Sequence, residues 1–198
     1  MNSIPAYKKY FFQKAQHRIL TVVRRKLFLT LEHHITANNM ASGDLRKAME
    51  ATARDFFDSY QAGTVQNDPS LVNRSVSPDC KRHLLPKSML KAAGIPVEFA
   101  FDNETYQNEF TKDLKLGSVG EHDVANLVID VEARKLAATT TTQIHYKVGE
   151  KERLTLEFSW FFNFNEDGSK ITKVVEFTDS NAVQKMLDIA AAAKKEVE

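Results

Sequence analysis

The sequence predicts one α+β domain in which helices come first and antiparallel strands follow. After residue 42 the apolar side chains recur at helical spacing. After Gly120 the spacing changes to two residues and the composition shifts toward Val, Ile, Thr and Phe, which is typical of strands. Strands that follow one another directly favour antiparallel pairing over a doubly wound sheet. A length of 198 residues suits a single core with an extension.

The longest predicted helix begins near Ser42. Its apolar face is formed by Leu45, Ala48, Met49, Phe56 and Tyr60. Gly63 is expected to end it, because glycine is common just after the last helical turn.

Prolines interrupt the next segment, residues 68–92, at positions 69, 78 and 86. Proline disrupts helix interiors, so this segment is expected to hold only short helical turns over 70–76 and 87–92. A third helix is predicted over 103–114, where Tyr106 and Phe110 are four residues apart and share a face. An Ala-rich helix over 181–194 closes the predicted order of elements.

Four strands are predicted, over residues 124–131, 136–148, 154–164 and 170–178. A two-residue turn at Asp167-Gly168 would place Glu176 opposite Ser159 and diagonal to Glu157 and Phe161. A turn longer by one residue would place it opposite Trp160 instead. Both registers put the Glu176 carboxylate among aromatic side chains.

A carboxylate in such surroundings is a candidate acid–base catalyst. Burial disfavours its charged form and raises its pKa toward neutral pH, where it can take up and release a proton. The alternative is that Glu157 and Glu176 face water, or line a subunit contact, on a sheet whose other side is core.

Composition and motifs exclude several classes of function. The 27 Lys and Arg against 26 Asp and Glu give a net charge of +1, which does not favour a nucleic-acid partner. No phosphate-binding loop, dinucleotide fingerprint, zinc-protease motif or esterase motif is present, so neither a cofactor nor a metal site is predicted. The single cysteine, Cys80, excludes an intrachain disulfide. No apolar run approaches the ~20 residues of a transmembrane segment.

Residues 1–40 are predicted to be a basic extension, separate from a domain over 41–198. Residues 1–39 carry seven Lys or Arg and one acid, Glu32. This composition is typical of a mitochondrial targeting segment or a membrane-surface helix, and the alternative is a loosely held extension. A cytoplasmic location is expected, with a mitochondrial one as the alternative, and Met40 is an alternative functional start.

Several segments resemble a known family. The element order, Phe162–Ile171 (FNFNEDGSKI) and Val175–Ser180 (VEFTDS) resemble the SnoaL-like polyketide cyclase group of the nuclear transport factor 2-like superfamily. Within that group, these segments are most similar to those of fungal proteins of secondary metabolism. Ser77–Ser88 and Val128–Lys135 also resemble that group, and the resemblance covers residues 44–187.

The resemblance implies a cone: a strongly curved antiparallel sheet wrapped around a long helix, with a pocket at its open end and often a homodimer through the sheet. It also implies a catalytic base on the last strand, five residues after the Ile that follows the Asp-Gly turn, which is Glu176. His83, Tyr106 and His145 are the candidate catalytic partners. His83 is displaced by one position from the family pattern, so Arg82 competes with it. The candidate substrate-binding residues are Arg82, Tyr60, Phe110, Glu157, Trp160 and Phe161.

The expected function is therefore a cofactor-independent isomerase, cyclase or dehydratase that acts on a hydrophobic polyketide- or terpenoid-like small molecule. Because this fold hosts many functions, two alternatives stay open: a non-catalytic small-ligand binder and a dimeric adaptor.

Overall fold

The computed structural model describes residues 42–92, 94–147 and 153–195. Residues from Leu45 onward belong to one compact unit. The predicted extension, its targeting role and the alternative start at Met40 lie outside the described residues. The boundary predicted between residues 40 and 41 therefore stays a prediction.

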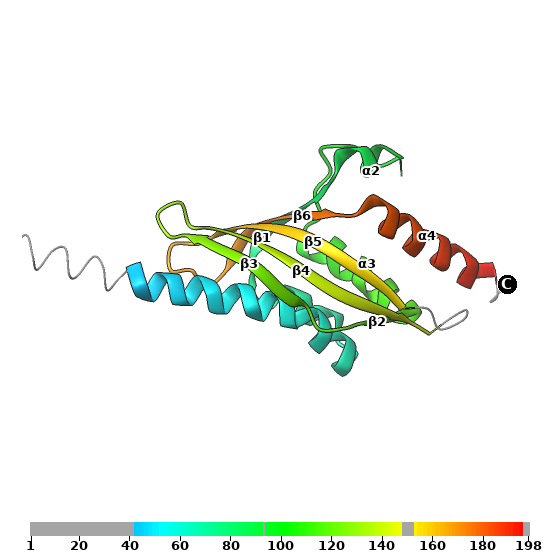
Figure 1. Cartoon of the computed structure of the whole chain (residues 1–198), viewed down its shortest axis with the longest axis horizontal. Helices are drawn as coiled ribbons and strands as arrows, with labels where there is room; N and C mark the ends of the chain where they lie inside the picture. Colours follow the sequence, from blue (N-terminus) through cyan, green and yellow to red (C-terminus); the bar gives the residue numbers. More distant parts are fainter. Residues whose placement is uncertain (1–41, 93, 148–152, 196–198) are drawn as a thin grey trace, which may run out of the picture. The chain divides into compact units, whose positions relative to one another are not determined.

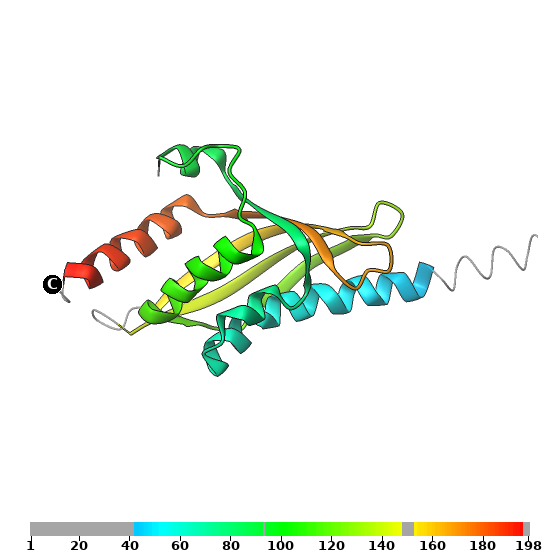
Figure 2. The ribbon, with the colours of Figure 1, turned by 180° about the vertical axis from the view of Figure 1, so that it is seen from behind.

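The compact unit is an α+β fold in which a strongly curved sheet wraps around helices (Figures 1 and 2). The first described element is a long helix over residues 42–66, and its part from Leu45 onward belongs to this unit. The elements that follow are the 3-10 helix η1 (Pro69–Asn73), β1 (Val76–Leu85), α2 (Lys87–Ala92), α3 (Asn103–Leu116), β2 (Gly117–Val119), β3 (Asp123–Asp130), β4 (Lys135–Tyr146), β5 (Arg153–Phe164), β6 (Ile171–Thr178) and α4 (Ser180–Lys195).

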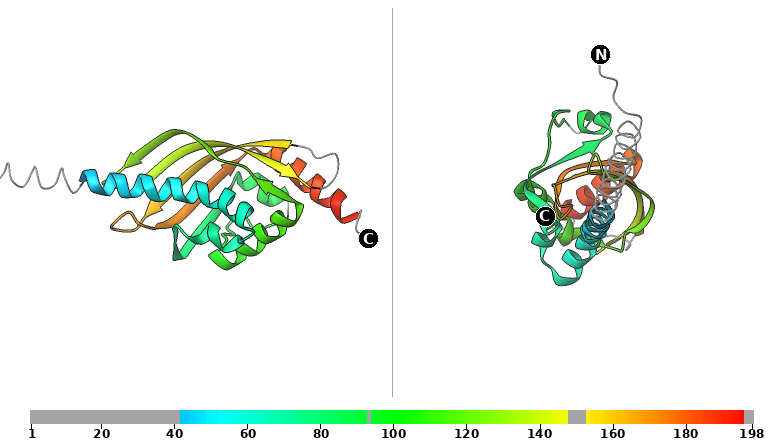
Figure 3. Two further views of the ribbon diagram at one scale, coloured as in Figure 1. Left: turned by 90° about the horizontal axis from the view of Figure 1, so that it is seen from below. Right: turned by 90° about the vertical axis from the view of Figure 1, so that its left-hand side faces the viewer.

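The strand order in the sheet is β1-β6-β5-β4-β2, and β3 also pairs with β4. The sheet curls around the long helix, as Figure 3 shows along the helix axis. The core forms where Phe56 and Phe57 of this helix meet β5, with the Phe56 ring centroid 4.9 Å from that of Phe162 and 5.6 Å from that of Trp160. The predicted α+β fold with a curved sheet around a long helix is confirmed.

The long helix continues past Gly63, contrary to the prediction. Gly63 is needed there for close packing rather than for ending the helix, because a Cβ atom at this position would lie 2.9 Å from Cε1 of Phe110 in α3. The missing side chain lets α3 approach the long helix and brings one wall of the site into place.

The prediction that residues 68–92 hold only short helical turns was wrong over residues 76–85, which form β1. The helical part ends at Asn73, and β1 pairs with β6 in parallel, so the sheet is mixed and not wholly antiparallel. The sheet accommodates Pro78 because the pairing with β6 is irregular between Val76 and Lys81, and proline is tolerated at such bulges. The short strand β2 was also missed.

The turn between β5 and β6 sets the register of the site. Gly168 adopts a φ of +73°, and the Thr52 hydroxyl of the long helix donates a 2.8 Å hydrogen bond to its carbonyl oxygen. Trp160 pairs with Glu176, so the longer-turn register is confirmed and the two-residue-turn register is wrong. Glu176 consequently shares the inner face of the sheet with Trp160.

Within the described ranges, no helix combines the length and the apolar character that crossing a membrane requires.

Candidate functional site

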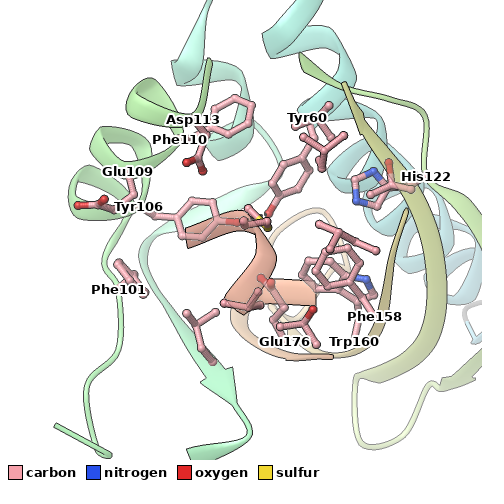
Figure 4. Close-up of a pocket in the computed structure, with 18 of the residues that line it drawn as sticks. Tyr60, Phe101, Tyr106, Glu109, Phe110, Asp113, His122, Phe158, Trp160 and Glu176 are labelled. Carbon is pink, nitrogen blue, oxygen red and sulfur yellow. Dashed lines mark hydrogen bonds between the residues drawn. The ribbon is translucent and has the colours of Figure 1, made fainter. Parts of the chain in front are cut away.

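A cavity of about 230 Å³ opens between the inner face of the sheet, α3 and the first turns of α4 (Figure 4). Its walls are mainly aromatic and aliphatic, with a few polar groups. It is lined by Tyr60, Leu84, Met89, Phe101, Tyr106, Glu109, Phe110, Asp113, Val119, His122, Thr142, Ile144, Leu156, Phe158, Trp160, Glu176, Thr178, Val183 and Met186. A concave apolar site with a few convergent polar groups is the usual form of a small-molecule site.

Glu176 supplies the carboxylate on the β6 wall of the cavity. It sits beside Trp160 on β5 and Leu84 on β1, the residues with which it pairs across the sheet. Desolvation in this apolar setting raises its pKa to about 7, although the Arg82 guanidinium acts in the opposite direction. A carboxyl group with this pKa can both accept and release a proton near neutral pH.

Two tyrosines join the long helix to α3 at the cavity wall. The hydroxyl groups of Tyr60 and Tyr106 lie 2.8 Å apart, and Nη1 of Arg82 donates a 3.2 Å hydrogen bond to Tyr60 Oη. Burial raises the pKa of Tyr60 to about 12 and that of Tyr106 well above its usual value. Both hydroxyls therefore stay protonated at neutral pH and can donate hydrogen bonds.

Arg82 holds this pair in place. It is 1% exposed, and its Nη2 donates hydrogen bonds to the Val72 carbonyl oxygen at 2.7 Å and to Asn73 Oδ1 at 2.8 Å. Its guanidinium carbon stacks 3.9 Å from the centroid of the Tyr106 ring. The cation thus anchors η1 and both tyrosines to β1.

A second carboxyl group enters the cavity from α3. Asp113 lies one helical turn after Glu109, and both come from the α3 side in Figure 4, whereas Glu176 comes from β6. Desolvation and the nearby Glu109 raise the pKa of Asp113 to about 6, and Lys112 acts against this. Glu109 itself forms a 2.7 Å ion pair with Lys112.

His122 faces the cavity from the loop between β2 and β3. Its ring centroid lies 5.3 Å from that of Tyr60 and 6.2 Å from that of Phe158. Burial lowers its pKa to about 4, so the ring is neutral at pH 7. It is 8% exposed, and its Nδ1 has no hydrogen-bond partner among the described residues. The Thr142 hydroxyl positions the loop by donating to the Glu121 carbonyl oxygen at 2.9 Å.

Six of the residues singled out from the sequence meet at this cavity. Glu176, Tyr106, Tyr60, Phe110 and Trp160 line it, and Arg82 reaches it through the two tyrosines that it contacts. The roles assigned to them stay predictions, but their proximity agrees with a shared site.

Four other candidates do not line the cavity. Glu157 and Phe161 alternate with Leu156 and Trp160 along β5, so in the observed register their exposed side chains lie on the outer face. His145 follows the cavity-lining Ile144 on β4, and His83 precedes the cavity-lining Leu84 on β1. Strand alternation therefore turns all four away from the site.

His122, Asp113 and Thr178 line the cavity but are not among the site residues predicted from the sequence. Asp113 follows Tyr106 by seven residues, so helical spacing could have placed it on the same face of α3. Thr178 follows Glu176 by two residues on β6 and could have been found by strand alternation. His122 lies in a loop, where no periodicity signals its direction.

A metal site was not predicted from the sequence. Across residues 42–92, 94–147 and 153–195, no group of three or more His, Cys, Asp or Glu side chains is placed to hold a metal ion.

Known structures share this architecture. PrhC from Penicillium brasilianum aligns with a TM-score of 0.63 at 17% identity, over 76% of this chain and 92% of that one. The pinacolase BvnE from Penicillium brevicompactum aligns with a TM-score of 0.61 at 19% identity, over 75% of this chain and 94% of that one. A putative SnoaL-like polyketide cyclase from Jannaschia aligns with a TM-score of 0.52 at 11% identity, over 70% and 90% of the two chains.

The chain has the SnoaL-like fold. The resemblance seen in the sequence is confirmed at this level. No family model and no curated protein matches the sequence. At these identities the SnoaL-like fold alone is shared, so the activity has to be argued from the site.

Proposed function

We propose that this chain is an isomerase, cyclase or dehydratase that needs no cofactor and acts on a hydrophobic, oxygenated polyketide- or terpenoid-like molecule of secondary metabolism. The observation that carries the proposal is the Glu176 carboxyl group. It stands in a largely apolar cavity beside protonated tyrosines, and desolvation raises its pKa to about 7. The fold shared with a pinacolase and a putative polyketide cyclase supports it.

Glu176 acts as the general base in this proposal. It removes a proton from a carbon next to a carbonyl or from a hydroxyl group, and it returns the proton to another position of the same molecule. Such a step leaves the atoms and electrons of the substrate balanced in an isomerisation. A positioned base contributes about 10²–10⁴-fold to a rate.

Tyr106 polarises the substrate oxygen. Because Tyr60 accepts a hydrogen bond from Arg82, its own proton can be donated to Tyr106 Oη, which leaves the Tyr106 proton free for a substrate carbonyl. Stabilising an oxyanion with a preorganised hydroxyl lowers the barrier. Phe110, Phe158 and Trp160 bind the carbon skeleton.

Metabolite profiling tests the proposal. We would compare a strain that lacks the gene with strains that carry the native gene, Glu176→Gln or Glu157→Gln. One compound should vanish in the null strain, and both the native gene and Glu157→Gln should restore it, because Glu157 lies on the outer face. Glu176→Gln should leave a precursor that identifies the substrate.

Full restoration by Glu176→Gln at normal protein level would contradict a catalytic base. It would favour the ligand-binding or adaptor alternative.

We also propose that the protein forms a homodimer through the outer face of the sheet. Phe161 is 50% exposed and Phe177 is 45% exposed there, and Val128 adds a further exposed apolar side chain. Phe161→Glu combined with Phe177→Glu should convert a dimer to a monomer in analytical ultracentrifugation, because burying these carboxylates in an apolar interface costs free energy. A native protein that sediments as a monomer at micromolar concentration would contradict the proposal.

A further inference from the structure

We infer that the cavity binds a ligand that carries a positively charged nitrogen, held between the carboxylates of Asp113 and Glu176 and the surrounding aromatic rings. This inference rests on the proposed small-molecule function of the cavity and narrows its substrate class to hydrophobic oxygenated molecules that also carry an amine or quaternary ammonium group.

The carboxylate side chains that line the cavity have no cationic side chain among their neighbours in the lining. Asp113, Glu109 and Glu176 line the cavity, whereas none of its lining residues is Lys or Arg. Neither Asp113 nor Glu176 forms an ion pair with a described residue, while Glu109 is paired with Lys112. Two carboxylates thus enter an apolar space from opposite walls without a counter-ion (Figure 4).

The nearest cation does not fill this role. The Nη atoms of Arg82 donate hydrogen bonds to Tyr60, Val72 and Asn73, and its guanidinium stacks on the Tyr106 ring. Glu176 is half-buried whereas Asp113 is exposed, so the cost of desolvation falls mainly on Glu176, and a cationic ligand would relieve that cost by pairing with it.

Aromatic side chains make up much of the cavity wall and also favour a cationic ligand. Aromatic rings line the same cavity from the long helix, α3, β5 and the segment before α3, namely Tyr60, Phe101, Tyr106, Phe110, Phe158 and Trp160. Aromatic faces attract ammonium groups within about 6 Å, and quaternary ammonium ligands are commonly held in aromatic cages. Rings combined with carboxylates therefore fit a cation better than a neutral or anionic group.

Two unpartnered polar groups show that the cavity is built to receive a ligand. His122 is 8% exposed and Thr178 is 4% exposed, and both line the cavity. Nδ1 of His122 and Oγ1 of Thr178 have no hydrogen-bond partner among the described residues. Buried polar atoms usually have hydrogen-bond partners, so we expect polar groups of a bound ligand to supply the partners of these two atoms.

Binding of a cation would depend on pH in a defined direction. Between pH 5 and pH 8 the facing groups that titrate are Asp113, with a pKa of about 6, and Glu176, with a pKa of about 7. His122 is neutral over this range, because its pKa is lowered to about 4.

The tyrosines near the two acids do not change charge over the same range. Tyr60, Tyr106 and Tyr146 have raised pKa values and stay neutral. Of the charged neighbours, Glu109 is paired with Lys112, and Arg82 donates hydrogen bonds to Tyr60, Val72 and Asn73. Affinity for a cation should therefore rise with pH.

The test compares two probes of the same shape, benzyltrimethylammonium and its uncharged carbon analogue neopentylbenzene. Trp160 is the only tryptophan of the full chain and lines the cavity, so its fluorescence reports binding of either probe. We expect the affinity for benzyltrimethylammonium to rise roughly 10-fold from pH 5 to pH 8, and that for neopentylbenzene to change by less than about 2-fold.

Matched variants locate the effect. Asp113→Asn and Glu176→Gln should each weaken binding of the cation at pH 8 by roughly 10-fold and leave the neutral probe unaffected. Glu157→Gln removes a carboxylate from the outer face and should change neither affinity. Circular dichroism confirms that each variant is folded.

The outcomes separate the two proposals. If neopentylbenzene binds and the cation shows no dependence on pH or on these variants, the cationic ligand is overturned while the small-molecule site stands. If neither probe binds to folded protein, both the cationic ligand and the small-molecule site are overturned.

Discussion

Glu176→Gln is expected to lower turnover by about 10²–10⁴-fold, because the amide cannot accept the proton that the carboxylate removes. The substrate for this assay is the precursor that accumulates in the profiling experiment. The native enzyme should gain activity as the pH rises through about 7, where Glu176 becomes ionised. An unchanged rate for the variant, or a native rate that falls over this range, would contradict the role of Glu176 as a base.

The same variant is expected to be more stable than the native protein above pH 7. The pKa of Glu176 is raised from 4.5 to about 7 in the folded state, so folding binds a proton between these values. The stability that this proton contributes is complete below pH 4.5 and is lost as the pH rises through 7. The shift corresponds to at most about 3 kcal/mol.

Urea unfolding at pH 4.5 and pH 8 measures this effect. Glutamine does not titrate, so the variant should match the native protein at pH 4.5 and exceed it at pH 8. A difference that is the same at both pH values would show that Glu176 is not desolvated. Gain of stability together with loss of turnover is the usual cost of a functional group held in unfavourable surroundings.

Arg82→Met is expected to reduce the free energy of unfolding by about 2–4 kcal/mol. Methionine fills much of the space that the Arg82 side chain occupies. It leaves the Val72 carbonyl oxygen and Asn73 Oδ1 without the hydrogen-bond donor that they have in the native protein. Buried acceptors without a donor are costly because water cannot replace the lost bond. Arg82→Lys should give an intermediate loss, since an ammonium group cannot reproduce the planar set of donors.

Equilibrium unfolding at pH 7 checks this prediction, with Lys81→Met as the control. Lys81 is the neighbour of Arg82 on β1, but its side chain is 55% exposed. A loss below about 1 kcal/mol for Arg82→Met would show that the buried network is not a stabilising feature. In folded Arg82→Met the pKa of Glu176 should also rise, because Arg82 lowers it in the native protein.

Periodicity was sufficient to predict much of this fold. The alternation of Leu156, Phe158, Trp160 and Phe162 predicted β5 but not which of its faces lines the cavity, and the four-residue spacing of Tyr106 and Phe110 predicted α3. The sequence could not predict β1. Arginine is usually exposed, so the sequence does not indicate that Arg82 faces inward. Proline usually interrupts a strand, and Pro78 is tolerated only because the pairing of β1 with β6 is irregular there.

The site could be predicted only where its residues belong to periodic elements. Glu176 was found because both registers of the last hairpin place it among aromatic side chains, and the observed turn then decided its face. His122 could not be found, since the direction of a loop residue depends on tertiary contacts such as the bonds that Thr142 makes to that loop. His145 was proposed from family resemblance, although its position next to Ile144 on β4 turns it away.

The parallel pairing of β1 with β6 also has a consequence for folding kinetics. The ladder joins Val76 to Ile171 and Leu84 to Glu176, residues that are far apart in the chain. Closing so long a loop costs conformational entropy before the contacts between β1 and β6 can form. The hairpins β4–β5 and β5–β6 need only short loops, because their strands follow one another in the chain. Docking of β1 is therefore expected to be a late step, so the site that Arg82 anchors is completed only when most of the sheet already exists.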